Sequence, residues 1–167
     1  MKHTIEPVFD KNSAILILGS FPSVRSREVG FYYGHPQNRF WKLISALTGS
    51  KYPVTVPEKK ALLLSHGIAL WDVIASCNIT GSSDTSIKNV IPNDIGGVIL
   101  SKCSIRHIYL NGGTAGRLFE RVFPGSDIPN TVLPSTSPAN ASFSLKMLID
   151  AWSVITEHMP CNSVNKM

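Results

Sequence analysis

The sequence contains few cysteines, and they are not arranged as a metal or cluster site requires. Its 167 residues include three, Cys77, Cys103 and Cys161, and no C-x-x-C pair. An odd number of widely spaced cysteines argues against a disulfide framework and indicates a reducing compartment. Three thiols are too few for the four thiolates of an iron–sulfur cluster. The five histidines lack metal-ligand spacing as well. We therefore expect neither a metal nor another cofactor.

Long apolar runs and phosphate-binding loops are also absent. No run approaches the roughly 18–20 apolar residues that span a bilayer. The first residues lack the apolar stretch of a secretory signal peptide. Neither G-x-x-x-x-G-K-[ST] nor G-x-G-x-x-G occurs, which disfavours nucleotide binding of those two kinds. We expect a cytoplasmic protein that contacts no membrane.

The composition favours one globular domain with a basic surface. Hydrophobic residues make up 43% of the chain and charged residues 16%, which is enough apolar material for a core. We expect one domain over residues 1–160 and a frayed tail over 161–167. The net charge of +5 favours polyanionic partners. Residues 23–60 carry seven Lys and Arg against two acidic residues, although a generally solvated basic surface would look the same.

Short apolar runs alternate with stretches of helical spacing along the chain. The runs predict strands at residues 14–18, 68–73, 105–110 and 131–133. Helices are predicted at residues 38–47, 57–64, 92–101, 114–122 and 142–158, with loops at 20–37 and 76–91. This alternation indicates an α/β fold, a three-layer α/β/α sandwich on a mostly parallel four-stranded sheet. Ligands in such folds bind beyond the carboxyl ends of the strands, which here means loops 19–37, 72–91, 111–114 and 134–141.

The first strand leads into Gly19-Ser20-Phe21-Pro22-Ser23. Glycine permits close approach of a ligand to the backbone, and proline stiffens the turn that follows the aromatic residue. An ordinary strand-to-loop turn would have the same composition.

Three consecutive aromatic residues, Phe31 to Tyr33, lie in a glycine-bounded loop ahead of a predicted helix. A nucleobase stacked on such a ring gains about 1–3 kcal/mol. Asn38 stands where that helix begins, and it is either a functional amide or simply the helix N-cap. Arg39 and Lys42 in the first turn either contact phosphates or form a solvated face.

A third loop, Leu133-Pro134-Ser135-Thr136-Ser137-Pro138-Ala139-Asn140, carries three hydroxyls between two prolines. A stiff loop of small donors suits phosphate contacts. An ordinary Pro/Ser turn is the alternative.

Together these segments resemble the uracil-DNA glycosylase superfamily, over most of the chain. The ending His35-Pro36-x-Asn38-Arg39-Phe40-Trp41 is similar to the mismatch-specific branch and its thymine-processing relatives. The first and third loops look most like the hypoxanthine-DNA (deoxyinosine) glycosylase branch.

Two positions depart from the usual pattern of the superfamily. Much of it has Asp or Asn at the third position of the first motif, to orient the attacking water, and this chain has Phe21. The last motif usually opens with His or Asn and carries a wedge leucine, whereas Leu133 opens it here and no leucine follows the serines. The hypoxanthine branch uses the Asn of the second motif instead, which is Asn38.

The resemblance implies a role for each motif. Asn38 would be catalytic and hold a water near the sugar C1′ through its carbonyl oxygen. The expected base pocket comprises Gly19, Ser20, Phe21, Pro22, Phe31, Tyr33 and Asn111, with the base stacked on Phe21 or Tyr33 and its O6 edge bonded near Ser20 and by the Asn111 amide. The expected DNA contacts are Ser23, Arg39, Lys42, Ser135, Thr136, Ser137 and Asn140.

We therefore expect a monomeric, monofunctional DNA glycosylase of the nucleoid that removes a deaminated base, preferably hypoxanthine, in base excision repair. The first alternative is a uracil or G:U/G:T mismatch glycosylase. The second is a module that binds damaged or single-stranded DNA without cutting it. A small hydrolase using Ser20 or Ser137 is disfavoured, because the G-x-S-x-G elbow is missing.

Overall fold

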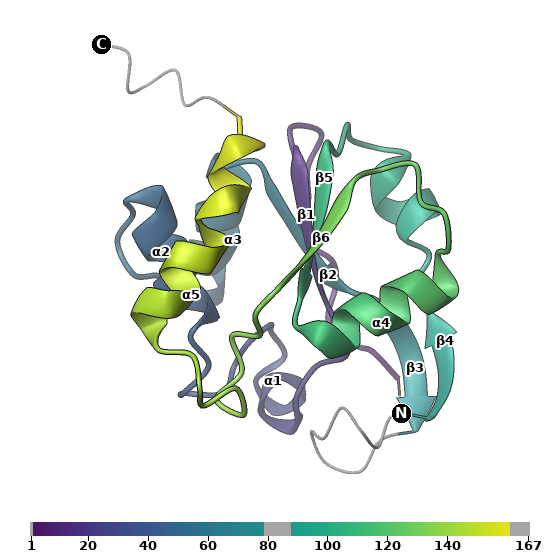
Figure 1. The fold of residues 1–167 in the computed structure, drawn as a ribbon, viewed down its shortest axis with the longest axis horizontal. Coiled ribbons are helices and arrows are strands. Elements are labelled where there is room, and N and C mark those ends of the chain that lie inside the picture. The colour runs from purple at the N-terminus through teal and green to yellow at the C-terminus, as the bar shows by residue number, and fades with distance from the viewer. Residues whose placement is uncertain (1, 79–87, 161–167) are drawn as a thin grey trace.

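A central sheet with helices on both faces forms the body of the protein (Figure 1). The computed structural model describes residues 2–78 and 88–160. The frayed tail expected over 161–167 lies outside the described residues. None of the helices in the described ranges is long and apolar enough to cross a membrane.

Four parallel strands form the sheet, in the order β2-β1-β5-β6. They are β1 (Ile15–Gly19), β2 (Ile68–Asp72), β5 (His107–Asn111) and β6 (Asn130–Leu133). Every residue of β1 and β2 is buried, as expected for parallel strands covered on both faces. The predicted α/β class and four-stranded parallel sheet are confirmed.

The helices form two outer layers (Figure 1). Helices α2 (Phe40–Thr48), α3 (Val56–Ser65) and α5 (Leu145–Trp152) lie on one side of the sheet, and α4 (Gly113–Val122) lies on the other. The N-terminus of α3 shows why it begins where it does. Thr55 accepts a bond from the Glu58 amide, and the Glu58 carboxylate accepts one from the Val54 amide.

Four predicted segments differ from the structure. The loop expected over 20–37 contains a short helix, α1 (Val24–Val29), because Ser23 caps its first turn. The loop expected over 76–91 overlaps two antiparallel strands, β3 (Ile74–Asn78) and β4 (Lys88–Pro92); residues 79–87 between them are not described. Exposed polar residues in these strands obscured the strand pattern in the sequence. The two helices predicted at 92–101 and 142–158 are irregular. The first is a π-helical turn, η2 (Gly96–Leu100), and the second is α5 extended by a 3₁₀ segment, η3 (Ser153–Glu157).

Two stacked histidines at the amino end of β5 make stability depend on pH. The rings of His107 and His158 lie 4.7 Å apart, and burial, followed by the charge of His158, lowers the pKa of His107. As the pH falls, His107 of the unfolded chain therefore binds a proton near pH 6.5, whereas His107 of the folded chain binds it only at a lower pH. We expect the free energy of unfolding to fall as the pH drops below about 6.5 and to level off below the folded-state pKa.

Urea unfolding at pH 7.5 and pH 5.5 measures this effect. His107→Asn should reduce the loss between the two pH values, and His35→Gln, at an exposed position, should not. An equal acid loss in wild type and His107→Asn would contradict the assignment.

Candidate active site

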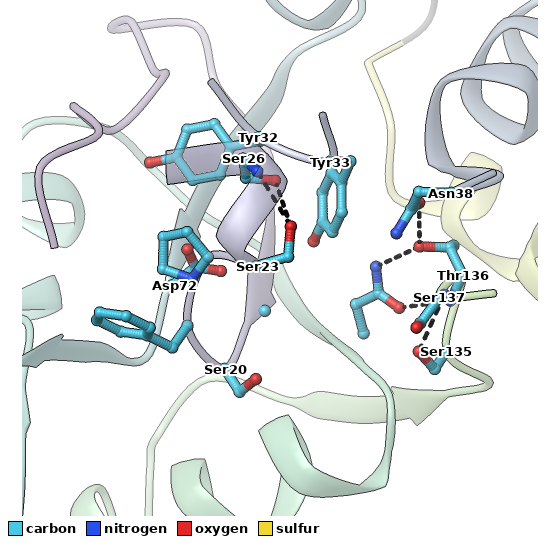
Figure 2. Close-up of a pocket in the computed structure, with 14 residues that line it drawn as sticks. Ser20, Ser23, Ser26, Tyr32, Tyr33, Asn38, Asp72, Ser135, Thr136 and Ser137 are labelled. Atoms are coloured by element: carbon cyan, nitrogen blue, oxygen red, sulfur yellow. Dashed lines mark hydrogen bonds between the residues drawn. The ribbon is translucent and has the colours of Figure 1, made fainter. Parts of the chain in front are cut away.

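A cavity lies at the carboxyl ends of the sheet strands, where the topology predicted a ligand site (Figure 2). Its volume is about 120 Å³, the scale of a single heterocycle and well below the roughly 300–1,000 Å³ of sites for drug-sized ligands. Its lining comprises Gly19, Ser20, Phe21, Pro22, Ser23, Ser26, Tyr32, Tyr33, Asn38, Asp72, Asn111, Ser135, Thr136 and Ser137. Segments far apart in the chain, including all three loops singled out from the sequence, therefore meet at one place.

Asn38 lines the cavity, with its amide held in one orientation. Its Oδ1 accepts bonds from the Phe40 backbone N–H at 2.9 Å and from the Thr136 hydroxyl at 3.0 Å. The Phe40 N–H is a donor, so the oxygen of the amide must face it. Within residues 2–78 and 88–160, Nδ2 makes no hydrogen bond, which leaves the NH₂ group as the available end of the side chain.

This geometry corrects the expected role of the Asn38 oxygen. Both lone pairs of Oδ1 are occupied, so the oxygen is not free to orient a water. The expectation that Asn38 caps the helix is right in part, since it serves the Phe40 N–H, although Arg39 is the N-cap residue of α2. The amide offers the cavity a donor.

Thr136 is the centre of a hydrogen-bond network behind Asn38. It is fully buried, and its hydroxyl donates to Asn38 and accepts from Asn111 Nδ2 at 3.0 Å. Its backbone N–H donates to Asn111 Oδ1, also at 3.0 Å. The predicted phosphate contact by Thr136 is therefore wrong, because the side chain has no access to solvent. Asn111 lines the cavity as predicted, but both ends of its amide are bonded to Thr136.

An acidic group that the sequence analysis did not single out forms another wall. Asp72 ends β2, is 3% exposed, and accepts a bond on Oδ2 from His3 Nε2 at 2.8 Å. Figure 2 shows Asp72 and Asn38 on opposite sides of the cavity, with Tyr33 between them. The position of Asp72 at the end of an apolar strand could have indicated it, whereas nothing in the sequence links it to His3, 69 residues away.

The Tyr33 hydroxyl reaches the same region. Its oxygen is buried and has no hydrogen-bond partner among the described residues. Burial raises the pKa of Tyr33 above its usual range, and the charge of Asp72 adds to this rise. The polar Asn111 side chain acts in the opposite direction and lowers this pKa, without a hydrogen bond to the hydroxyl. The hydroxyl is thus a protonated donor. The backbone at Tyr33 has φ 53°, in a region that aromatic residues rarely occupy.

Of the aromatic residues that were predicted to contact the base, two line the cavity and one lies in the core. Phe21 lines the cavity, with the His3 ring edge-on at 5.9 Å and the Arg27 guanidinium 5.6 Å from its centroid. Tyr33 stacks on Phe40 at 4.1 Å. Phe31 does not line the cavity, which corrects its assignment to the base pocket: it is 3% exposed and stacks on Trp41, because the core takes up its apolar ring.

The hydroxyl loop is held by bonds within itself. Ser135 accepts a bond from the Ser137 amide, and Ser137 accepts one from the Ala139 amide. Asn140 lies outside the cavity lining, and its Nδ2 donates to the Ser135 carbonyl. The three side chains shape this loop, and their predicted DNA contacts are untested.

Arg39 also holds this loop, which corrects its predicted phosphate contact. Its guanidinium donates to the carbonyls of Ser137 at 2.9 Å, Asn140 at 3.1 Å and Phe143. Its backbone N–H donates to the Thr136 carbonyl at 3.1 Å. Arg39, the residue after Asn38, thus connects the start of α2 to the loop that carries Thr136. Lys42, in contrast, is exposed and remains available for a phosphate.

Arg39→Gln is expected to lower the free energy of unfolding by about 2–4 kcal/mol, because it leaves several loop carbonyls without a hydrogen-bond donor. Urea unfolding measures this, with Lys42→Ala as the control. Lys42→Ala should leave stability unchanged and reduce the salt dependence of DNA binding by about one unit of slope. If Arg39→Gln instead leaves stability unchanged and reduces the salt dependence of DNA binding, as expected for Lys42→Ala, then Arg39 contacts a phosphate as the sequence predicted.

The fold and the cavity together describe a small polar pocket at the carboxyl ends of the parallel strands of an α/β scaffold. A family model described as the uracil DNA glycosylase superfamily matches residues 6–156. The chain belongs to this superfamily, which confirms the resemblance found in the sequence.

Within the superfamily, the chain is similar to two proteins described as hypoxanthine DNA glycosylases. The one from Methanosarcina acetivorans is 37% identical over 159 residues, which are 95% of this chain and 99% of the relative. The one from Methanosarcina barkeri is 31% identical over 153 residues, 91% of this chain and 96% of the relative. The NMR solution structure of a proposed uracil DNA glycosylase from Methanosarcina acetivorans superposes with a TM-score of 0.80 at 34% identity, covering 94% of this chain and 97% of that one.

Proposed function

We propose that this protein is a monofunctional DNA glycosylase that hydrolyses the N-glycosidic bond of hypoxanthine in DNA. The observation that supports this most strongly is similarity over nearly the full length to two hypoxanthine DNA glycosylases, at 37% and 31% identity. The cavity adds a physical reason, since its volume of about 120 Å³ suits one heterocycle, and Asn38 and Asp72 both line it. Its partner is DNA that contains deaminated bases, which it meets as a monomer in the cytoplasm.

The target nucleotide must leave the duplex before it can enter the cavity. Eversion costs a few kcal/mol, and the cost is least for weakly paired bases. Hypoxanthine pairs weakly, so part of the selectivity arises before any contact with the pocket. The excess of basic residues over 23–60, which includes the exposed Lys42, supplies charge that attracts DNA phosphates.

Asn38 is the catalytic residue in this proposal. Its Nδ2 donates to the oxygen of a water beside the sugar C1′, while Phe40 and Thr136 fix the plane of the amide through Oδ1. The water attacks C1′ as the bond to N9 breaks, the bonding electrons leave with the base, and the proton of the water passes to solvent. An amide is a negligible base, so the step relies on placement and on late attack on an oxocarbenium-like sugar.

Stabilising the departing base supplies much of the remaining acceleration. A preorganised donor aimed at developing negative charge contributes about 3 kcal/mol. The protonated Tyr33 hydroxyl is such a donor. Among the described residues that line the cavity there is no lysine, which favours direct hydrolysis over a Schiff-base intermediate.

A panel of labelled duplexes tests this proposal. Each carries one hypoxanthine, uracil, xanthine or mismatched thymine, and alkali cleaves the abasic product. We expect hypoxanthine to be released first and no strand cleavage before alkali. Fastest release of uracil would instead support a uracil or mismatch glycosylase.

A binding module without activity is the second candidate, because the Asn38 oxygen does serve the start of α2. It predicts equal affinity for intact and abasic duplexes and no released base after hours with excess protein.

A further inference from the structure

The end of β1 brings two polar groups of opposite character to one point in the cavity. A Cβ atom on Gly19 would overlap Asp72 Oδ1 and lie 3.2 Å from the Tyr33 hydroxyl. Asp72 Oδ1 and the Tyr33 hydroxyl therefore both lie close against Gly19, in space that a side chain at this position would need. Nothing in the proposed cleavage step uses Asp72.

His3 fixes which oxygen of Asp72 faces the cavity. Its Nδ1 accepts a bond from the Ile5 backbone N–H at 3.3 Å, so the proton of the neutral ring lies on Nε2. Nε2 then donates to Asp72 Oδ2 at 2.8 Å. The segment is anchored by the His3 backbone N–H, which donates to the Ala75 carbonyl. Asp72 thus keeps Oδ1 for the cavity, as an acceptor only.

Tyr33 supplies the complementary donor. Its hydroxyl is buried without a partner among the described residues, which is an unfavourable arrangement unless a ligand satisfies it. Stacking on Phe40 holds the ring in place. The unusual backbone conformation at Tyr33 is consistent with a residue that is positioned for a site rather than for stability.

We propose that Asp72 and Tyr33 recognise the lactam edge that deamination creates on a base, with Asp72 Oδ1 accepting the ring N–H and the Tyr33 hydroxyl donating to the adjacent carbonyl. His3 is a positioning residue that keeps the carboxylate in this orientation. This inference rests on the proposed function, because it names how the same cavity selects its base.

The chemistry of the bases explains the selectivity. Adenine has a bare N1 beside an amino group, and deamination turns this edge into the N1–H and C6 carbonyl of hypoxanthine. A carboxylate attracts the N1–H and repels the N1 lone pair, so it favours hypoxanthine over adenine. The carboxylate also opposes negative charge on the departing base, and the Tyr33 donor beside it offsets that effect.

Asp72→Asn tests the assignment because His3 controls how the new amide lies. The His3 donor holds the amide oxygen at the place of Oδ2, so the NH₂ group takes the place of Oδ1 and faces the base. The variant should therefore repel the N1–H of hypoxanthine and accept a base with a bare N1. The exposed Asp127→Asn is the matched control.

Binding to duplexes with a 2′-fluoro sugar, which resists cleavage, separates recognition from catalysis. One duplex carries hypoxanthine and the other unsubstituted purine, whose N1 is an acceptor. We expect the wild-type preference for hypoxanthine to fall at least about 30-fold in Asp72→Asn, since a site left with mismatched buried polar groups discriminates strongly. Asp127→Asn should keep the preference. An unchanged preference in folded Asp72→Asn would overturn the proposal.

A second measurement needs no variant. Wild-type protein should bind 1-methylhypoxanthine at least about 30-fold more weakly than hypoxanthine, and equal binding would overturn the proposal even if Asp72→Asn fails to fold. Failure of the proposed function has a different signature. Wild type would then release no hypoxanthine from ordinary duplexes, whatever its binding preference.

Discussion

Replacing Asn38 by alanine is expected to slow hypoxanthine release by about 100- to 1,000-fold, the usual cost of losing one preorganised donor. The variant removes the Nδ2 donor from the cavity. It also removes the oxygen that accepts from Phe40 and Thr136. Single-turnover rates with excess enzyme measure the effect on the chemical step, free of product release.

Asn38→Asp separates the two ends of the amide. It keeps an oxygen for Phe40 and Thr136 but presents a second oxygen, in place of the NH₂ group, to the cavity. If Nδ2 is the functional group, Asn38→Asp should be impaired nearly as much as Asn38→Ala. Activity equal to or above wild type would contradict the donor role and restore the water-orienting oxygen expected from the sequence. Ser142→Ala, exposed and outside the cavity lining, is the control.

Gly19→Ala is expected to reduce hypoxanthine release by at least about 100-fold. The added methyl group would overlap Asp72 Oδ1 and approach the Tyr33 hydroxyl, and it would therefore displace the two groups that are proposed to contact the base edge. Asp72 is held by His3 in the buried wall, so it has little room to move. Rates and thermal unfolding should be measured together, because the overlap also strains the fold.

A matched change shows whether the position or the substitution causes the loss. Gly96→Ala adds the same methyl group at a glycine where a Cβ meets nothing within 4 Å, and it should leave the rate unchanged. A rate for Gly19→Ala within about threefold of wild type would place the base elsewhere in the cavity.

The sheet was predictable because each strand carries its own signal. The run Ala14 to Leu18 is apolar without interruption, as a strand covered on both faces must be. The carboxyl-end rule then located the cavity without further information. β3 and β4 were not predicted, because their exposed residues give a polar pattern that resembles a loop.

The site was predictable in position but not in the partners of each side chain. The resemblance to the superfamily assigned Asn38 and Thr136 to the same site, yet the bond between them joins residues 98 apart. Arg39 looked like a phosphate ligand, because nothing local shows that loop carbonyls surround its guanidinium. His3 and Asp72 were missed for the same reason: their pairing exists only in the folded chain.

Product identification after a single turnover on a deoxyinosine duplex in ¹⁸O-labelled water directly tests whether the protein hydrolyses the N-glycosidic bond of hypoxanthine. Mass spectrometry should detect free hypoxanthine and one ¹⁸O atom at C1′ of the abasic sugar, both greatly reduced in Asn38→Ala. The same assay on a uracil duplex should give a slower reaction. An intact strand with hypoxanthine still attached, or release of uracil alone, would contradict the proposed hypoxanthine DNA glycosylase activity.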